Sequence, residues 1–140
     1  MKRLLVALAL IPSLTFAEEP SKWSVFSKMP NGTVWEVKNN SLDVITNDSK
    51  QMFWIVQFRT HQDGKTVYDF VKIAVGLSAC KAQSGQLVLV GMDNVEKAKI
   101  DFVFDGGTLA SNMAEAVCSA GDKVLKKYAE EAEKPSELST

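Results

Sequence analysis

The chain has 140 residues, of which 46% are hydrophobic and 24% charged, and its formal net charge is −1. This slightly acidic composition has charges of both signs and no basic stripe, which argues against a nucleic-acid-binding protein. The length is sufficient for one domain with a single hydrophobic core.

The first 17 residues have the pattern of a bacterial secretory signal peptide. A basic start is followed by an apolar run and by the small residue Ala17, after which cleavage is expected. A transmembrane helix is the competing interpretation, but Pro12 interrupts a run that is short of the ~20 residues needed to cross a bilayer. We therefore predict no membrane span and one exported domain over residues 18–134, periplasmic or secreted. Loss of Lys2 and Arg3 takes its formal net charge to −3.

Alternating apolar residues predict two hairpins in the first part of this domain. The first covers residues 22–37 and turns at Pro30-Asn31-Gly32. The polar residues 39–50 are predicted to form a loop, with a short turn of helix at its centre as an option. The second, longer hairpin covers residues 51–79 and turns at Asp63-Gly64.

Two more strands follow, over residues 86–91 and 97–104. The second of them alternates charged and apolar residues, which is typical of a strand with one face in solvent. We expect residues 135–140 to be a disordered tail, because this acidic end of the chain contains Pro135 and only one large apolar residue.

A C-terminal helix is predicted to begin after Gly107, with Thr108 as its cap. Apolar side chains then recur every three or four residues as far as Tyr128. Gly121 either ends this helix or weakens it by about 1 kcal/mol. The elements together predict an α+β fold, in which an antiparallel, strongly twisted sheet of about five to six strands is packed by one C-terminal helix.

Cys80 and Cys118 are predicted to form a disulfide, because two cysteines in an exported protein are more often paired than free. Their spacing, without a nearby histidine pair, does not match a metal site. Cys80 lies between two predicted strands and Cys118 within the helix, so the bond would fix the helix to the sheet. A redox role is the alternative, but the chain contains no C-x-x-C motif.

The register of the long hairpin decides which side chains share a face of the sheet. We expect Phe58 to lie opposite Phe70 and Arg59 opposite Asp69, because aromatic and opposite-charge pairs each stabilise a sheet by about 0.2–1 kcal/mol. This register predicts an apolar set on each face: Phe53, Ile55, Val71, Ile73 and Val75 on one, and Trp54, Val56, Phe58, Tyr68 and Phe70 on the other.

One helix is about 10 Å wide and can cover only one face of such a sheet. The aromatic face is therefore the candidate contact surface: Trp54, Phe58, Tyr68 and Phe70. Either the sheet curls so that Trp23, Phe26 or Trp35 close over this face, or the face stays open and contacts another protein or a second copy of the chain.

Residues with catalytic potential do not form a recognisable set. His61, the only histidine, falls in a predicted turn, so an exposed turn residue is favoured over a general base. Asp101 and Asp105 fit a solvated strand face and a turn better than paired catalytic carboxylates. Gly106-Gly107 could bind an anion at the helix N-terminus, but a plain connection is favoured. We expect no enzymatic activity, no cofactor and no metal.

Four segments resemble the surface-adhesin protein E-like domain family: TVWEVKNNSLDV, FWIVQFRT, SACKAQSGQLVLV and TLASNMAEAVCSAG. The family has an early aromatic strand ending near a Ser-Ile/Leu pair, a central hairpin, a cysteine before a strand and a second cysteine in a C-terminal helix. The matching residues here are Trp35, Ser41, Leu42, Cys80 and Cys118.

This resemblance implies an antiparallel sheet packed by the terminal helix, with a disulfide between them. It also implies adhesion, because the adhesin that names the family is a surface lipoprotein that binds host extracellular-matrix proteins. The present chain departs from that protein in having no lipidation cysteine at the expected cleavage site.

Two classes of function follow from the sequence. The first is a non-catalytic exported binding module of the bacterial envelope, with a protein as its partner. The alternative is a small periplasmic enzyme inhibitor or ligand-binding protein that works through a loop or a sheet cleft.

Overall fold

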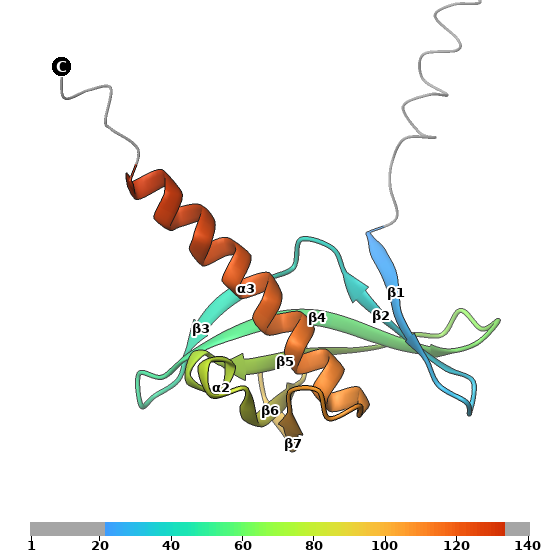
Figure 1. Ribbon diagram of the computed structural model, residues 1–140. Coiled ribbons are helices and arrows are strands. Elements are labelled where there is room, and N and C mark those ends of the chain that lie inside the picture. The colour runs from blue at the N-terminus through green and yellow to red at the C-terminus, as the bar shows by residue number, and fades with distance from the viewer. Residues whose placement is uncertain (1–21, 134–140) are drawn as a thin grey trace, which may run out of the picture.

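The computed structural model describes residues 22–133, which form an antiparallel sheet with a long helix across one face (Figure 1). The arrangement confirms the α+β class and the packing of a C-terminal helix on the sheet. The signal peptide predicted for residues 1–17 and the disordered tail predicted for residues 135–140 lie outside the described residues.

Within residues 22–133 the sheet has seven strands, and all paired strands are antiparallel. In chain order they are β1 (Trp23–Lys28), β2 (Thr33–Lys38), β3 (Asp43–Thr46), β4 (Met52–Gln62), β5 (Asp69–Gly76), β6 (Ser84–Val90) and β7 (Glu96–Val103). They lie in the order β1-β2-β4-β5-β6-β7, and β3 pairs with the start of β4. β4 therefore has β5 on one side and both β2 and β3 on the other.

Both predicted hairpins are present. The chain turns between β1 and β2 at Gly32, whose amide donates to the carbonyl of Met29 at 3.0 Å. Gly32 has a φ of +91°, a conformation that glycine adopts without steric cost. The strands predicted over residues 86–91 and 97–104 are also confirmed as β6 and β7, each shifted by one or two residues.

Two short elements correct the prediction. The first is β3, which lies in the stretch predicted as a loop and places Val44 opposite Trp54. A strand of four residues among polar neighbours shows too little alternation of apolar and polar side chains to be predicted. It forms because the exposed edge of β4 offers hydrogen-bonding partners to its backbone. The second is the helix α2 (Leu77–Ala82), which carries Cys80 and ends where Gln83 has a left-handed φ of 62°.

The expected register of the long hairpin is wrong by one residue. Phe58 lies opposite Val71 instead of Phe70, and Arg59 lies opposite Phe70 instead of Asp69. Arg59 instead pairs with Glu36 of β2, so the charge pair that was expected to set the register is made on the other side of β4. A shift of one residue moves a whole set of side chains to the other face. Trp54, Val56 and Phe58 thus share a face with Val71, Ile73 and Val75, whereas Phe70 lies on the opposite face.

The helix α3 (Leu109–Glu133) crosses the face of the sheet that carries Trp54 and Phe58 (Figure 1). Its N-terminus is capped as predicted, because the hydroxyl of Thr108 accepts the amide of Ser111 at 3.0 Å. The helix continues through Gly121, and its last turns extend beyond the sheet, so Leu125 and Tyr128 are exposed. Within residues 22–133 no helix is long and apolar enough to cross a membrane.

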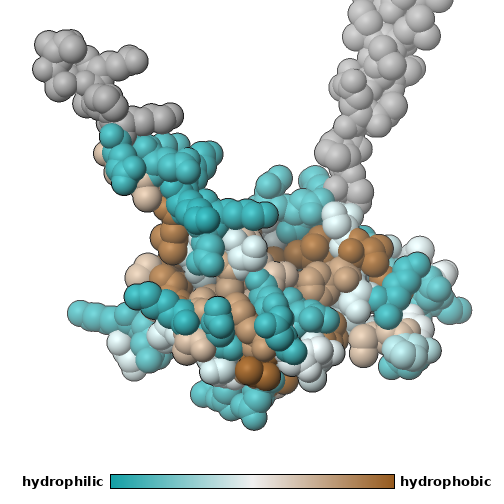
Figure 2. All heavy atoms as spheres, in the orientation of Figure 1, coloured by the Kyte–Doolittle hydropathy of each residue, from teal (hydrophilic) through white to brown (hydrophobic). Residues whose placement is uncertain are grey.

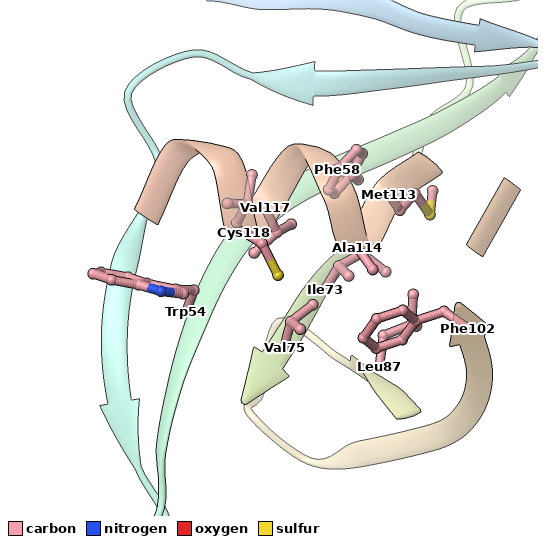
Figure 3. Close-up of a cluster of buried hydrophobic side chains, with 11 residues drawn as sticks. Trp54, Phe58, Ile73, Val75, Leu87, Phe102, Met113, Ala114, Val117 and Cys118 are labelled. Carbon is pink, nitrogen blue, oxygen red and sulfur yellow. The ribbon is translucent and has the colours of Figure 1, made fainter. Parts of the chain in front are cut away.

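The main core lies between α3 and this face of the sheet (Figure 3). Its buried members come from β4 to β7 and from one side of α3: Trp54, Val56, Phe58, Ile73, Val75, Leu87, Phe102, Met113, Ala114, Val117 and Cys118. Phe26 and Trp35 of the first hairpin stack edge-on against Phe58, with ring centroids 5.4 and 6.4 Å away. Aromatic residues of the first hairpin therefore pack against Phe58, but they do so on the face that α3 covers and not on a separate second face as in the predicted alternative.

The predicted disulfide between Cys80 and Cys118 is present, with Cα atoms 5.5 Å apart. It joins α2 to α3, and α2 is continuous with β5 and nearly so with β6. The bond closes a loop in the unfolded chain, and in the chain-entropy model this stabilises the folded state by about 4 kcal/mol. Disulfides of this kind are typical of proteins from oxidising compartments outside the cytosol.

Candidate functional site: the face of the sheet opposite the helix

The face of the sheet opposite α3, here called the open face, carries a second and smaller hydrophobic cluster. Its members are the alternate residues of the three central strands: Phe53, Ile55, Ala74, Val88 and Val90. No element of the described range packs over this face as α3 packs over the other one. The cluster is therefore the floor of a surface that faces outward.

A hollow of about 400 Å³ lies over this floor. Ile45 of β3 forms one wall, and its side chain is 40% exposed. Asn47, Asn94 and Glu96 line the hollow with polar groups. Its volume lies at the lower end of the roughly 300–1,000 Å³ that is usual for binding pockets. The hollow can therefore accommodate one large apolar side chain.

A smaller hollow of about 180 Å³ adjoins the first one, and Ile45 and Asn94 line both. The ammonium of Lys72 donates to the side-chain oxygen of Asn94 at 2.8 Å, which fixes both groups at this boundary. Asp43 also lines the smaller hollow. The surface thus combines an apolar floor with a rim of both charge signs, as protein contact surfaces commonly do.

The other end of the open face carries an arginine surrounded by aromatic rings, here called the Arg59 cluster: Trp23, Glu36, Arg59, His61, Tyr68 and Phe70. The Nε of Arg59 donates to a carboxylate oxygen of Glu36 at 2.6 Å. Its guanidinium carbon lies 4.4 Å from the ring centroid of Trp23 and 3.9 Å from that of Tyr68. These contacts combine a charge-assisted hydrogen bond with two cation–π interactions.

The same cluster joins four strands or their ends. Trp23 comes from β1, Glu36 from β2 and Arg59 from β4, and Phe70 of β5 lies 5.7 Å from Trp23 between ring centroids. His61 packs edge-on against Tyr68 with centroids 5.1 Å apart. Arg59 therefore holds the aromatic rings in place, and the side chain of Phe70 remains 47% exposed.

The four residues predicted as a contact surface do not lie together. Tyr68 and Phe70 are on the open face, in the Arg59 cluster. Trp54 and Phe58 are only 4% and 1% exposed and belong to the core beneath α3. The physical reason is the one-residue shift of register, which separates Phe58 from Phe70.

The other polar residues singled out in the sequence have structural partners. His61 lies in β4 rather than in a turn, with its Nε2 3.7 Å from Glu36. Asp101 accepts a hydrogen bond from Gln86 at 2.9 Å. Gly106 donates its amide to Val103 in the connection between β7 and α3. Among residues 22–133 no three histidine, cysteine, aspartate or glutamate side chains are grouped so that they could hold a metal ion.

A second concave surface lies beside α3, between the helix and residues 37–42. This groove has a volume of about 360 Å³, and Phe58 and Val117 contribute to its base. In Figure 2 hydrophobic side chains gather beside the lower half of α3, over β1 and β2, whereas the projecting end of the helix is hydrophilic. Lys38 and Lys123 also line the groove.

Sequence reasoning missed Ile45 and most of the hollow around it. Ile45 was assigned to a loop, and Val88 and Val90 were not assigned to a face. No comparable signal marked Ile45, although Phe53 and Ile55 were expected on one apolar face from the run FWIV at residues 53–56. Such a run indicates a strand with two apolar faces.

Comparisons with known proteins add no further assignment. No family model matches the chain, and no curated protein and no solved structure matches it either. The resemblance to the surface-adhesin protein E-like family therefore stays a prediction, and the functional inference rests on the geometry described above.

Proposed function

We propose that this protein is a non-catalytic exported binding module of the bacterial envelope, which holds a protein partner against the open face of its sheet. The single observation that carries the proposal is the hollow lined by Ile45, Phe53 and Val90 on a face that no described element covers. An apolar floor with a polar rim is the arrangement in which interface hot spots are found.

The chemistry of the hollow favours a polypeptide that inserts one apolar anchor residue. Asn47 and Asn94 provide hydrogen-bonding groups around such an anchor. Lys72 provides a positive charge at the rim and Asp43 and Glu96 provide negative charges, so a strongly acidic partner is disfavoured. Adhesion to a host protein, which the family resemblance implies, would be one instance of this function.

The disulfide and the pattern of residues 1–17 support export. We expect the mature protein to begin at Glu18 after cleavage behind Ala17. Intact-mass measurement of the protein recovered from the periplasm or the medium checks this, and a chain that retains residues 1–16 would refute cleavage after Ala17.

A ligand-binding function is the second candidate, and the groove beside α3 favours it. Its walls are apolar, and Lys38 and Lys123 supply positive charge, so it fits an amphiphile with an anionic head better than a protein segment. A loss of this function would follow from Val124→Glu in the groove and not from a change on the open face.

Matched variants test the proposed protein contact. Ile45→Glu puts a charge into the hollow, whereas Val67→Glu puts the same charge on an 80% exposed side chain between β4 and β5. We expect proteins captured from an envelope extract by the wild type to be lost with Ile45→Glu and retained with Val67→Glu. Circular dichroism checks that both variants fold. Equal capture by the two variants would exclude the hollow as the contact.

A further inference from the structure

The two ends of the sheet differ in how open they are to further strand pairing. In the described range the strands at the two ends of the sheet are β1 and β7, and the four-residue β3, which pairs with β4 alone, is a further but shorter edge. β1 contains an irregularity between Val25 and Ser27, and such bulges discourage pairing at an edge. β7 also has an irregularity, but it lies near the start of the strand at Lys97, and from Ala98 to Val103 β7 pairs regularly with β6, whereas the irregularity of β1 lies in the middle of that strand. β7 is therefore the edge on which another strand can be added.

Backbone hydrogen bonds show which groups of β7 point outward. The amide of Phe104 donates to Gln83 at the end of the β6 ladder, so by alternation Phe102 and Ile100 also face β6. Lys99 and Asp101 then direct their backbone groups away from the sheet. The outward groups of Val103 are occupied, since its amide donates to Ser111 and its carbonyl accepts from Gly106.

We propose that two copies of the chain join through β7, antiparallel across a two-fold axis at Ile100, into one continuous sheet. In this register Lys99 of each copy lies opposite Asp101 of the other. The outward backbone groups of the two residues exchange hydrogen bonds, and their side chains form an ion pair, so each contact occurs twice across the axis. A shift of the axis to Lys99 or to Asp101 would place like charges opposite each other, which destabilises a sheet.

The side chains at the axis support the same register. Ile100 is 40% exposed on the side of the sheet that α3 covers, although its partner in β6 is the fully buried Leu87. Across the two-fold axis the two Ile100 side chains would face each other in a pair without hydrogen bonds, where side chains approach most closely. The pairing buries an apolar group that the single chain leaves in solvent.

Charge reversal tests this pairing. Lys99→Asp gives a chain with aspartate at both positions, and Asp101→Lys gives a chain with lysine at both, so each variant alone places like charges opposite each other. We expect sedimentation velocity over a concentration series to show a wild-type dimer whose dissociation constant rises about tenfold or more in either variant. The equimolar mixture of the two variants should restore a dimer, because every aspartate then faces a lysine.

Circular dichroism provides the folding control, since both side chains are exposed on an edge strand. The wild-type dimer should also weaken as salt is raised, because its ion pairs are screened. A wild-type chain that stays monomeric at every concentration overturns the proposal. Lys99 would then be a charged edge residue that prevents strand pairing. A dimer that both variants retain, or that the mixture fails to restore, overturns it as well.

Discussion

The indole ring of Trp54 lies directly against the backbone of Gly121, so a methyl group built on Gly121 would overlap the ring. This contact lets α3 approach β4 closely at the point where the helix leaves the sheet. Gly121 therefore neither ends the helix nor merely weakens it. It gives the space that the largest side chain of the core requires.

Replacement of Gly121 by alanine should destabilise the protein although alanine is the better helix former. Forcing a methyl group into a packed core costs about 1–3 kcal/mol, against a gain in helix propensity of about 1 kcal/mol. We expect the free energy of unfolding in urea to fall by up to about 2 kcal/mol. Ser119→Ala, on the exposed side of the same helix, is the control and should change it by less than about 0.5 kcal/mol. A Gly121→Ala variant as stable as the wild type would show that Trp54 can move aside.

Removal of both cysteines should lower the free energy of unfolding by about 2–5 kcal/mol, as for other disulfides of small secreted domains. The double variant Cys80→Ala/Cys118→Ala leaves α3 held by its apolar contacts and by the hydrogen bonds of Ser111 and Glu115 to the end of β7 and the connection after it. Reduction with dithiothreitol should destabilise the wild type to a similar extent and leave the double variant unchanged. Titration of the unreduced, denatured wild type should find no free thiol, and two free thiols would contradict the bond.

Phe58 and Phe70 should respond differently to truncation, because the register puts them on opposite faces. Phe58→Ala opens a cavity in the core and should cost about 3–5 kcal/mol. Phe70→Ala removes a half-exposed ring from the Arg59 cluster and should cost about 1 kcal/mol. Urea unfolding of the two variants checks the difference. Similar losses for both would indicate that the two rings share one buried face.

Arg59 and Glu36 should be energetically coupled. Their side chains are 17% and 13% exposed, so breaking the pair leaves a charge that is poorly solvated. A double-mutant cycle with Arg59→Met and Glu36→Gln should give a coupling free energy of about 1–2 kcal/mol. The cycle of Glu36→Gln with Lys99→Met on β7 is the control and should be additive. If the effects of the two substitutions in the Arg59 cycle are additive, the pair contributes no coupling free energy and does not stabilise the fold.

The sequence predicted the elements that follow from local patterns. The hairpin turn at Gly32, the Thr108 cap and the apolar repeat in α3 depend on neighbours along the chain, and all three are observed. The disulfide also followed from the sequence, because two cysteines allow only one intramolecular pairing. These features position the core face of the sheet.

The open face depends on long-range pairing, which the sequence does not display. The register of β4 with β5 differs from the expected one, and Arg59 pairs with Glu36, 23 residues earlier in the chain, instead of with Asp69. β3 forms only because β4 offers it an edge. Once these two facts are known, the alternation of side chains gives the floor of the hollow.

Hydroxyl-radical footprinting of the free protein and of its captured complex tests most directly whether the open face is the binding face. In the free protein Ile45 and Phe70 should be oxidised readily, and the buried Phe58 slowly. In the complex Ile45 and Phe53 should become protected, while Val124 in the groove beside α3 keeps its free-state rate. Protection of Val124 with unchanged oxidation of Ile45 would contradict binding at the open face and move it to the groove.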